Sequence, residues 1–173
     1  PESVQHQVGI RLANRYVAVR ADSPVPIELL QRLFAPHLCP VDGSAAQQVS
    51  LYRDADGYRI EGGGPSLTQI PDDAHLPHVL CQALLYGLSN VEDEHLMLHA
   101  AALSQGEQGI LMAARSGSGK TTLAAWMIEH GHRFLTDELV AVDAQGMMHG
   151  LARPLNLKQW GESAVQGLRW LER

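Results

Sequence analysis

Hydrophobic and polar residues alternate along the first third of the chain. The alternation runs through residues 8–12 and 16–19, and it returns over 49–60 on both sides of Asp56-Gly57. A period of two is typical of half-buried β-strands, and an Asp-Gly pair supplies the positive φ that a hairpin turn needs. Between the two predicted hairpins, Pro26 is placed to open a short helix. The pattern therefore predicts a β-rich N-terminal region.

Three glycines at 62–64, followed by Pro65, interrupt this pattern. Such a cluster breaks regular structure, so we expect a boundary here between residues 1–64 and residues 65–173. The second part begins with apolar residues at a 3.6-residue spacing over 77–88, which predicts a helix.

The remaining pattern predicts several short strands and one further helix. The strands are expected over 96–103, 110–113, 134–135 and 139–142, the last pairing with residues from 147 onward. The helix is expected over 120–130, with Gly131 directly after it, where a left-handed residue commonly ends a helix. Strands that follow one another so closely pair antiparallel, and we expect an α/β fold with a mixed, largely antiparallel sheet.

Composition excludes two classes of protein. Of the 173 residues, 45% are hydrophobic and 18% are charged, with a formal net charge of −6, as in ordinary globular proteins. The chain lacks the clustered Lys and Arg that phosphate-backbone binding requires, so no nucleic-acid partner is expected. No apolar run approaches the roughly 18 residues of a membrane span, and no secretory signal is visible. We therefore expect a cytoplasmic protein without a membrane partner.

One segment carries the signature of a phosphate-binding loop. Residues 114–121 match the pattern Gly-x-x-x-x-Gly-Lys-Ser/Thr except at the first position, which is Ala114. Glycines let backbone N–H groups turn toward an anion, and the positive end of the following helix dipole points at it. The candidate nucleotide-binding residues are Ala114, Arg115, Ser116, Gly117, Ser118, Gly119, Lys120, Thr121 and Thr122.

Further residues complete a candidate catalytic set. Lys120 would hold the β- and γ-phosphate oxygens, and the Thr121 hydroxyl would bind Mg²⁺. Asp137 and Glu138 follow the predicted strand at 134–135, where one carboxylate would organise Mg²⁺ and the other would accept a hydroxyl proton. His99, on the strand before the loop strand, is a candidate for the same pocket. A solvated acidic pair and a satisfied core histidine are the alternative interpretations.

Other polar residues give weaker signals. Cys39 and Cys81 stand far apart, which indicates small buried side chains rather than a disulfide or a metal site. Pairs of histidines at 75 and 78 and at 95 and 99 lack partners at zinc-ligand spacing. Arg153 and Lys158 are candidate cations for a second phosphate or for the acceptor, and a solvated basic edge is the alternative.

These motifs together resemble a known family. The chain from His99 through the loop at 116–121 to the run 131–138, Gly-His-Arg-Phe-Leu-Thr-Asp-Glu, is similar to the catalytic core of HPr kinase/phosphorylase and the HprK-related kinases. Residues 153–158 look like the shorter members of that group. The resemblance implies a phosphoenolpyruvate-carboxykinase-like fold, with a largely antiparallel sheet around a P-loop helix.

The resemblance also implies roles for single residues. Lys120 and Thr121 would bind the phosphates of ATP and Mg²⁺, Asp137 would be the base that deprotonates the acceptor serine, and Glu138 would stand near the metal. His99 would match the active-site histidine of the family. Two positions depart from the family pattern, because Ala114 replaces a glycine and Glu138 replaces an aspartate.

The sequence thus predicts a phosphotransferase that uses ATP and Mg²⁺ and transfers a phosphoryl group to a serine of a protein or peptide. A small-molecule kinase, a phosphorylase running the reaction backwards and a non-catalytic nucleotide sensor are the alternatives, and a homo-oligomer stays open. The amphipathic residues Val165, Leu168 and Leu171 stand where the family usually continues, so we expect a core truncated at its C-terminus.

Overall fold

The computed structural model describes residues 6–43, 45, 47–64, 69–115, 117–157 and 169–171, without the side chains of 155–157 and 169–171. The chain forms two compact units, Pro1–Asp93 and Glu94–Arg173. The fold is α/β, and its sheets are mixed and largely antiparallel, as expected. The division after Asp93 lies later in the chain than the boundary expected after Gly64.

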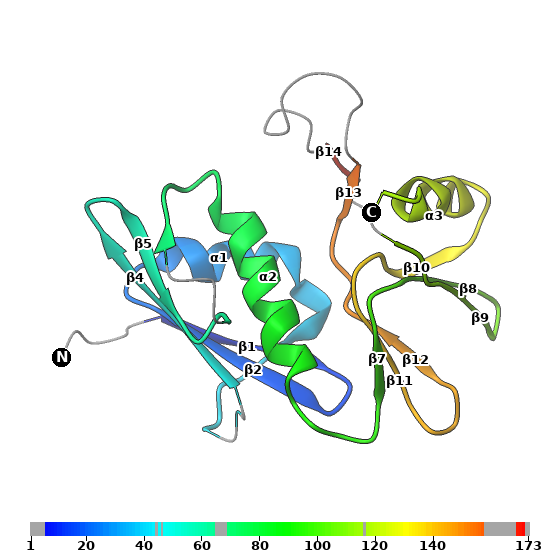
Figure 1. Ribbon diagram of the computed structural model, residues 1–173, viewed down its shortest axis with the longest axis horizontal. Helices are drawn as coiled ribbons and strands as arrows, with labels where there is room; N and C mark the ends of the chain where they lie inside the picture. The colour runs from blue at the N-terminus through cyan, green and yellow to red at the C-terminus, as the bar shows by residue number, and fades with distance from the viewer. Residues whose placement is uncertain are drawn as a thin grey trace. The chain divides into compact units, whose positions relative to one another are not determined.

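In the N-terminal unit, the described residues form one sheet with two helices (Figure 1). In spatial order its strands are β3 (Leu38–Cys39), β1 (His6–Leu12), β2 (Arg15–Ala21), β4 (Gln47–Asp54), β5 (Gly57–Glu61) and β6 (Gln69–Ile70). The helices are α1 (Pro24–Leu33), followed by the 3-10 turn Ala35–His37, and α2 (Leu76–Ser89). Among the described strands of this unit, only β2 and β4 pair in parallel, because α1 carries the chain back across the sheet between them.

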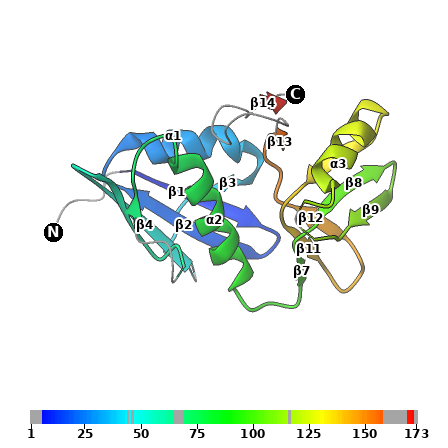
Figure 2. The ribbon, with the colours of Figure 1, turned by 45° about the horizontal axis from the view of Figure 1, so that its top comes forward.

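The two helices lie over the sheet (Figure 2). Their buried residues are mostly apolar, such as Ile27 and Leu30 of α1 and Leu80 and Leu84 of α2. Val17 and Val19 of β2 are fully buried, and Gly87 of α2 lies so close to β2 that a Cβ there would stand 2.9 Å from Val17 Cγ2. This packing explains the position of the boundary, since α2 contacts β2 and β4 and so belongs to the first unit.

The predicted hairpins and helices of this unit are confirmed, with one shifted start. β1 pairs with β2 and β4 with β5, where Gly57 has φ +122°. The helix expected from Pro26 begins at Pro24, because proline is favoured at the first helical position and Ser23 before it is extended.

The described residues of the C-terminal unit form short antiparallel strands and one helix. The strands are β7 (Leu96–Leu98), β8 (Ala101–Gln105), β9 (Gln108–Met112), β10 (Arg133–Thr136), β11 (Val140–Val142), β12 (Met148–Gly150), β13 (Leu155–Leu157) and β14 (Arg169–Leu171). They form sheets in the orders β10-β8-β9, β12-β11-β7 and β13-β14. The helix α3 spans Lys120–Glu129 and ends before Gly131, whose φ is +89°, as expected.

Two hydrophobic clusters of this unit meet at β8. Ala101 and Leu103 pack with Ala124 of α3, whereas Ala100 and Ala102 pack with Val140 of β11. Successive side chains of an extended segment point to opposite faces. The run 100–103 therefore supplies both clusters, and all four of its residues are fully buried.

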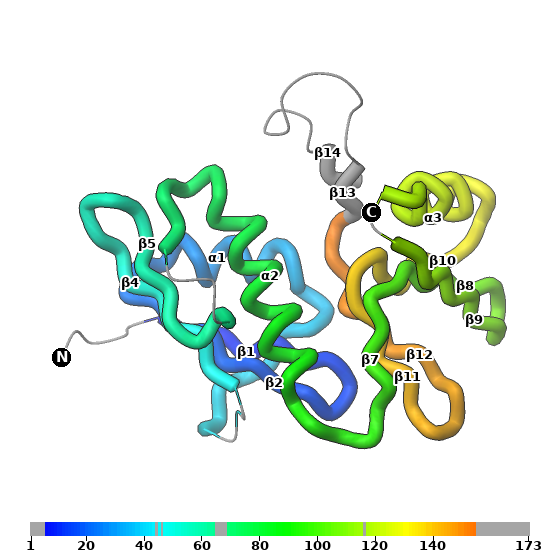
Figure 3. The backbone as a smooth tube through the Cα atoms, in the orientation of Figure 1, coloured from blue at the N-terminus to red at the C-terminus, as the bar shows by residue number. Residues whose placement is uncertain are grey.

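The expectation of one strand over 96–103 is wrong. The chain leaves sheet β12-β11-β7 after Leu98, passes through His99 and Ala100, and enters sheet β10-β8-β9 at Ala101 (Figure 3). A continuous apolar run has the same sequence pattern whether it forms one buried strand or two. The strands with which each half pairs come from elsewhere in the chain, and the pattern of the run does not reveal them. The predicted hairpins on either side, β8 with β9 and β11 with β12, are confirmed.

Two further observations complete the fold. The described residues contain no helix long and apolar enough to cross a membrane. Of the predicted C-terminal amphipathic residues, Val165 and Leu168 lie outside the described residues, and Leu171 lies in β14. Lys158 also lies outside the described part.

Arg15 holds the end of α2 in the first unit. Its side chain is 4% exposed, and its Nη1 donates to the carbonyl oxygens of Leu88 at 2.7 Å and Ser89 at 3.4 Å. Its Nη2 pairs with Asp93 Oδ1 at 2.6 Å. A cation that bonds the last carbonyls of a helix also offsets the negative end of the helix dipole.

We expect Arg15→Met to lower the free energy of unfolding by about 2–4 kcal/mol, because it leaves buried helix carbonyls and the Asp93 carboxylate without their donor. Urea unfolding followed by circular dichroism measures the change. Arg32→Met, at an exposed arginine in the last turn of α1, is the control and should change stability by less than about 0.5 kcal/mol. Equal effects of the two substitutions would contradict the assignment.

Candidate functional site

The glycine-rich loop lies between β9 and α3, in the predicted strand-loop-helix order. Gly117 has φ +80° and Gly119, the N-cap of α3, has φ +89°. A Cβ at either glycine would meet no atom within 4 Å, so the left-handed backbone and not the space requires glycine there. Among the described non-glycine residues, only Ala13 has a positive φ. Ala114 is therefore compatible with the backbone of the loop, and Ser116 lies outside the described residues.

Lys120 folds back over this loop. Its Nζ donates to the carbonyl oxygen of Ala114 at 2.5 Å and to that of Arg115 at 3.1 Å. The backbone N–H of Ser118 donates to the same Arg115 oxygen at 3.2 Å. The described loop residues before Lys120 are exposed, as is Thr122, whereas Thr121 is half-buried. The first turn of α3 is thus open to solvent, with an ammonium group beside it.

Thr136 shapes the turn that carries the two acids. Its hydroxyl donates to the carbonyl oxygen of Leu151 at 2.9 Å and accepts the backbone N–H groups of Glu138 at 3.1 Å and Leu139 at 3.4 Å. The pairing of β10 with β8 also shifts register between Phe134 and Thr136. These contacts end the strand at Thr136 and turn the next two residues out of it.

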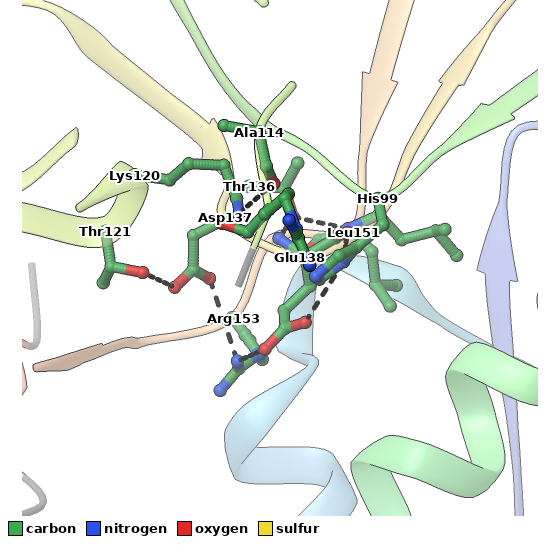
Figure 4. A network of polar contacts seen from close by, with 11 residues as sticks. His99, Ala114, Lys120, Thr121, Thr136, Asp137, Glu138, Leu151 and Arg153 are labelled. Atoms are coloured by element: carbon green, nitrogen blue, oxygen red, sulfur yellow. Dashed lines mark hydrogen bonds and ion pairs between the residues drawn. The ribbon is translucent and has the colours of Figure 1, made fainter. Parts of the chain in front are cut away.

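Asp137 faces the loop from this turn (Figure 4). Its Oδ2 stands 3.5 Å from the hydroxyl of Thr121, and its Oδ1 stands 3.8 Å from Nη2 of Arg153. The side chain is 4% exposed. Burial raises the pKa of Asp137, the Arg153 guanidinium offsets part of this effect, and the neighbouring Glu138 carboxylate adds to it.

Glu138 lies on the other side of the same turn. Its carboxylate pairs with Nη2 of Arg153, and its Oε2 is 3.7 Å from Nδ1 of His99. The same histidine nitrogen stands 2.7 Å from the backbone carbonyl oxygen of Glu138, which it reaches as a donor when Nδ1 is protonated. The break between β7 and β8 places His99 here, and its side chain is 60% exposed.

The structure thus brings most of the predicted site residues together in one unit. Thr121 and Asp137 meet, and His99 meets Glu138. Two contributions were not predicted from the sequence: the role of Thr136 in the turn and the contact of Arg153 with the two acids. A threonine before two acids at a strand end is typical of a turn held by a side-chain hydroxyl, and this signal was available. No local signal pairs Arg153 with the acids, because it comes from the chain after β12.

The donor set suits a magnesium nucleotide. The Thr121 hydroxyl and the Asp137 carboxylate supply oxygen, and Asp137 Oδ1 is buried without a hydrogen-bond partner, so it can accept one more contact. Mg²⁺ commonly takes one or two protein oxygens and completes its shell with phosphates and water. Within the described ranges, no group of three or more His, Cys, Asp or Glu could hold a metal ion by itself.

Comparisons with family models, with curated proteins and with solved structures give no match for this chain. The function is therefore argued from the residues of this site.

We expect Asp137→Asn to raise the melting temperature at about pH 7. The raised pKa means that the folded state holds the Asp137 proton more tightly than the unfolded chain does. The charged carboxylate therefore lowers the stability of the folded state once the pH rises above 3.8, the ordinary pKa of an aspartate. The gain should shrink as pH falls to 3.8 and below, where the side chain becomes protonated in both states. Calorimetric melting in the presence of EDTA measures it.

Asp143→Asn is the matched control with the opposite sign. Asp143 accepts the backbone N–H groups of Met147 at 2.8 Å and Gln145 at 3.0 Å, and the first of these is the main cause of its lowered pKa. This carboxylate contributes stability above 3.8 that is lost as pH falls through the lowered pKa, so its replacement should lower the melting temperature at neutral pH. The same sign for both variants would contradict the prediction.

Proposed function

We propose that this protein is a kinase that transfers a phosphoryl group from ATP, with Mg²⁺, to a hydroxyl group, and that the acceptor is a serine of a protein or peptide. The observation that carries the proposal is the distance of 3.5 Å between Thr121 Oγ1 and Asp137 Oδ2. It joins the first turn of the helix after a phosphate-type loop to a buried acid from a separate strand. Such a pair is what phosphoryl transfer needs at the γ-phosphate.

The site residues then divide the work, and Asp137 has two tasks: it would hold Mg²⁺ and it accepts a proton. The backbone N–H groups of the loop and the positive end of α3 bind the phosphates, and Lys120 exchanges its two loop carbonyls for β- and γ-phosphate oxygens. Mg²⁺, held by the Thr121 hydroxyl and by Asp137, would neutralise the charge that develops on the phosphates. Asp137 accepts the proton of the attacking hydroxyl. The acceptor oxygen forms a bond to the γ-phosphorus, and the bond from that phosphorus to the bridging oxygen of ADP breaks.

We propose for Glu138 a different role from the metal-side role that the family resemblance implied. Its carboxylate is engaged by Arg153 and lies near His99. We therefore assign the metal position to Thr121 and Asp137, and we assign to Glu138 the orientation of Arg153 and His99. The longer side chain of glutamate, compared with aspartate, reaches the guanidinium across the turn.

The resemblance to HPr kinase/phosphorylase and the HprK-related kinases supports a serine as the acceptor and a phosphoenolpyruvate-carboxykinase-like arrangement of this unit. The antiparallel sheets around α3 agree with that arrangement at the level of fold class. The exposed first turn of α3 is accessible to a large acceptor such as a protein segment.

We expect Lys120→Ala to abolish binding of ATP–Mg²⁺ and Asp137→Asn to keep binding within about 3-fold while lowering phosphoryl transfer by at least about 10³-fold. Calorimetric titration measures binding, and transfer of labelled γ-phosphate to proteins of a cell lysate measures activity. Ala114→Gly is the matched control within the loop, and it should leave ATP affinity within about 3-fold because the backbone at 114 is not left-handed.

The outcomes separate the alternatives. A wild-type chain that binds no nucleotide overturns the proposal. Binding that depends on Lys120 without any transfer indicates a nucleotide sensor, and ATP consumption with hydroxyl compounds but no labelled protein indicates a small-molecule kinase. A labelled protein band that disappears with Asp137→Asn identifies the acceptor.

A further inference from the structure

The guanidinium of Arg153 is buried beside the two acids of the site. Its side chain is 8% exposed, and it follows Thr136's partner Leu151 by two residues. Nη2 pairs with the Glu138 carboxylate and stands 3.8 Å from Asp137 Oδ1, which is beyond hydrogen-bond distance. Arg153 therefore lies near the candidate base, Asp137, without forming a hydrogen bond to it.

Two polar atoms of this arrangement have no hydrogen-bond partner. Arg153 Nε and Asp137 Oδ1 are both buried without a hydrogen bond. A buried unpaired donor or acceptor is unfavourable, and in native structures such atoms are rare enough to require an explanation. Here the donor is Arg153 Nε and the acceptor is Asp137 Oδ1, and the two side chains are neighbours.

The two oxygens of Asp137 face different groups. Oδ2 faces the Thr121 hydroxyl, on the side of the loop, whereas Oδ1 faces Arg153. A ligand that satisfies both unpaired atoms must offer a hydrogen-bond donor to Asp137 Oδ1 and an acceptor oxygen to Arg153 Nε. A hydroxyl group in contact with a phosphoryl group offers both, because the O–H donates and the phosphoryl oxygens accept.

We infer that Arg153 is a further catalytic residue of this site, whose Nε–H group binds an oxygen of the phosphoryl group in transfer. The inference rests on the proposed function. In the transfer step the acceptor hydroxyl loses its proton to Asp137 and its oxygen bonds to the γ-phosphorus, while the electron pair of the broken bond leaves on ADP. Arg153 stabilises the negative charge on the phosphoryl oxygens, and its guanidinium keeps all of its protons throughout the step.

The charges nearby fit this role. The Glu138 carboxylate fixes the guanidinium through Nη2, so the remaining donors keep one orientation. A preorganised cation costs no rearrangement at the moment of reaction, which is the basis of electrostatic stabilisation in active sites. Arginine is also suited to this position because its planar group serves a carboxylate and a phosphoryl oxygen at the same time.

The test compares nucleotides with and without the γ-phosphate. ADP–Mg²⁺ and the non-hydrolysable analogue AMP-PNP–Mg²⁺ are titrated calorimetrically into wild type, Arg153→Lys, Arg153→Met and the control Arg133→Met. Arg133 is an exposed residue of β10, and its replacement removes one positive charge from the same unit. We expect both Arg153 variants to lose about 10–100-fold in affinity for AMP-PNP while their affinity for ADP stays within about 3-fold. The control should change neither affinity.

Arg153→Lys distinguishes catalysis from structure. The lysine side chain keeps a positive charge that can pair with Glu138, but it has only one nitrogen. It therefore preserves a purely structural ion pair and lacks the second donor, Nε–H, that would bind the phosphoryl oxygen. Full recovery of AMP-PNP affinity in Arg153→Lys would overturn the inference, and so would an equal loss for ADP and AMP-PNP. Wild type is measured first, and its failure to bind either nucleotide would refute the proposed function itself.

Discussion

A single buried hydroxyl organises the candidate site. The Thr136 side chain is fully buried and takes part in three hydrogen bonds, to Leu151, Glu138 and Leu139. The two N–H contacts set the direction in which Asp137 and Glu138 leave the strand, and the contact to Leu151 fixes the segment that ends in Arg153. Acid, partner acid and guanidinium therefore share one anchor, although they come from two separate stretches of chain.

Charge and burial then give the two acids different environments. Asp137 is more deeply buried than Glu138, and burial raises its pKa, which suits the role of proton acceptor that we propose for it. Glu138 is tied to the guanidinium and lies beside His99. Adjacent residues in a strand-like turn point in different directions, so one turn can present one acid to the loop and the other to a cation.

The sequence predicts local features well because they depend on neighbouring residues. The hairpin at Gly57, the helix from Lys120 and its end at Gly131 follow from turn chemistry and periodicity. The break at His99 and the pairing of Arg153 with Glu138 could not be predicted in this way, since both depend on segments distant in the chain. The end of the first compact unit also depends on distant segments, because α2 contacts β2 and β4 and the unit extends to Asp93.

The run Ala100–Leu103 has a consequence for how the second unit unfolds. Its side chains alternate between two hydrophobic clusters, one that includes α3 and one that includes β11. Neither cluster can lose this segment without exposing the other, so the two sheets share one cooperative transition. The glycine-rich loop leads into α3, beside the first cluster, and the acidic turn leads into β11, beside the second. Loop and acids therefore depend on the same buried segment, and a loss of its packing would disturb both halves of the site.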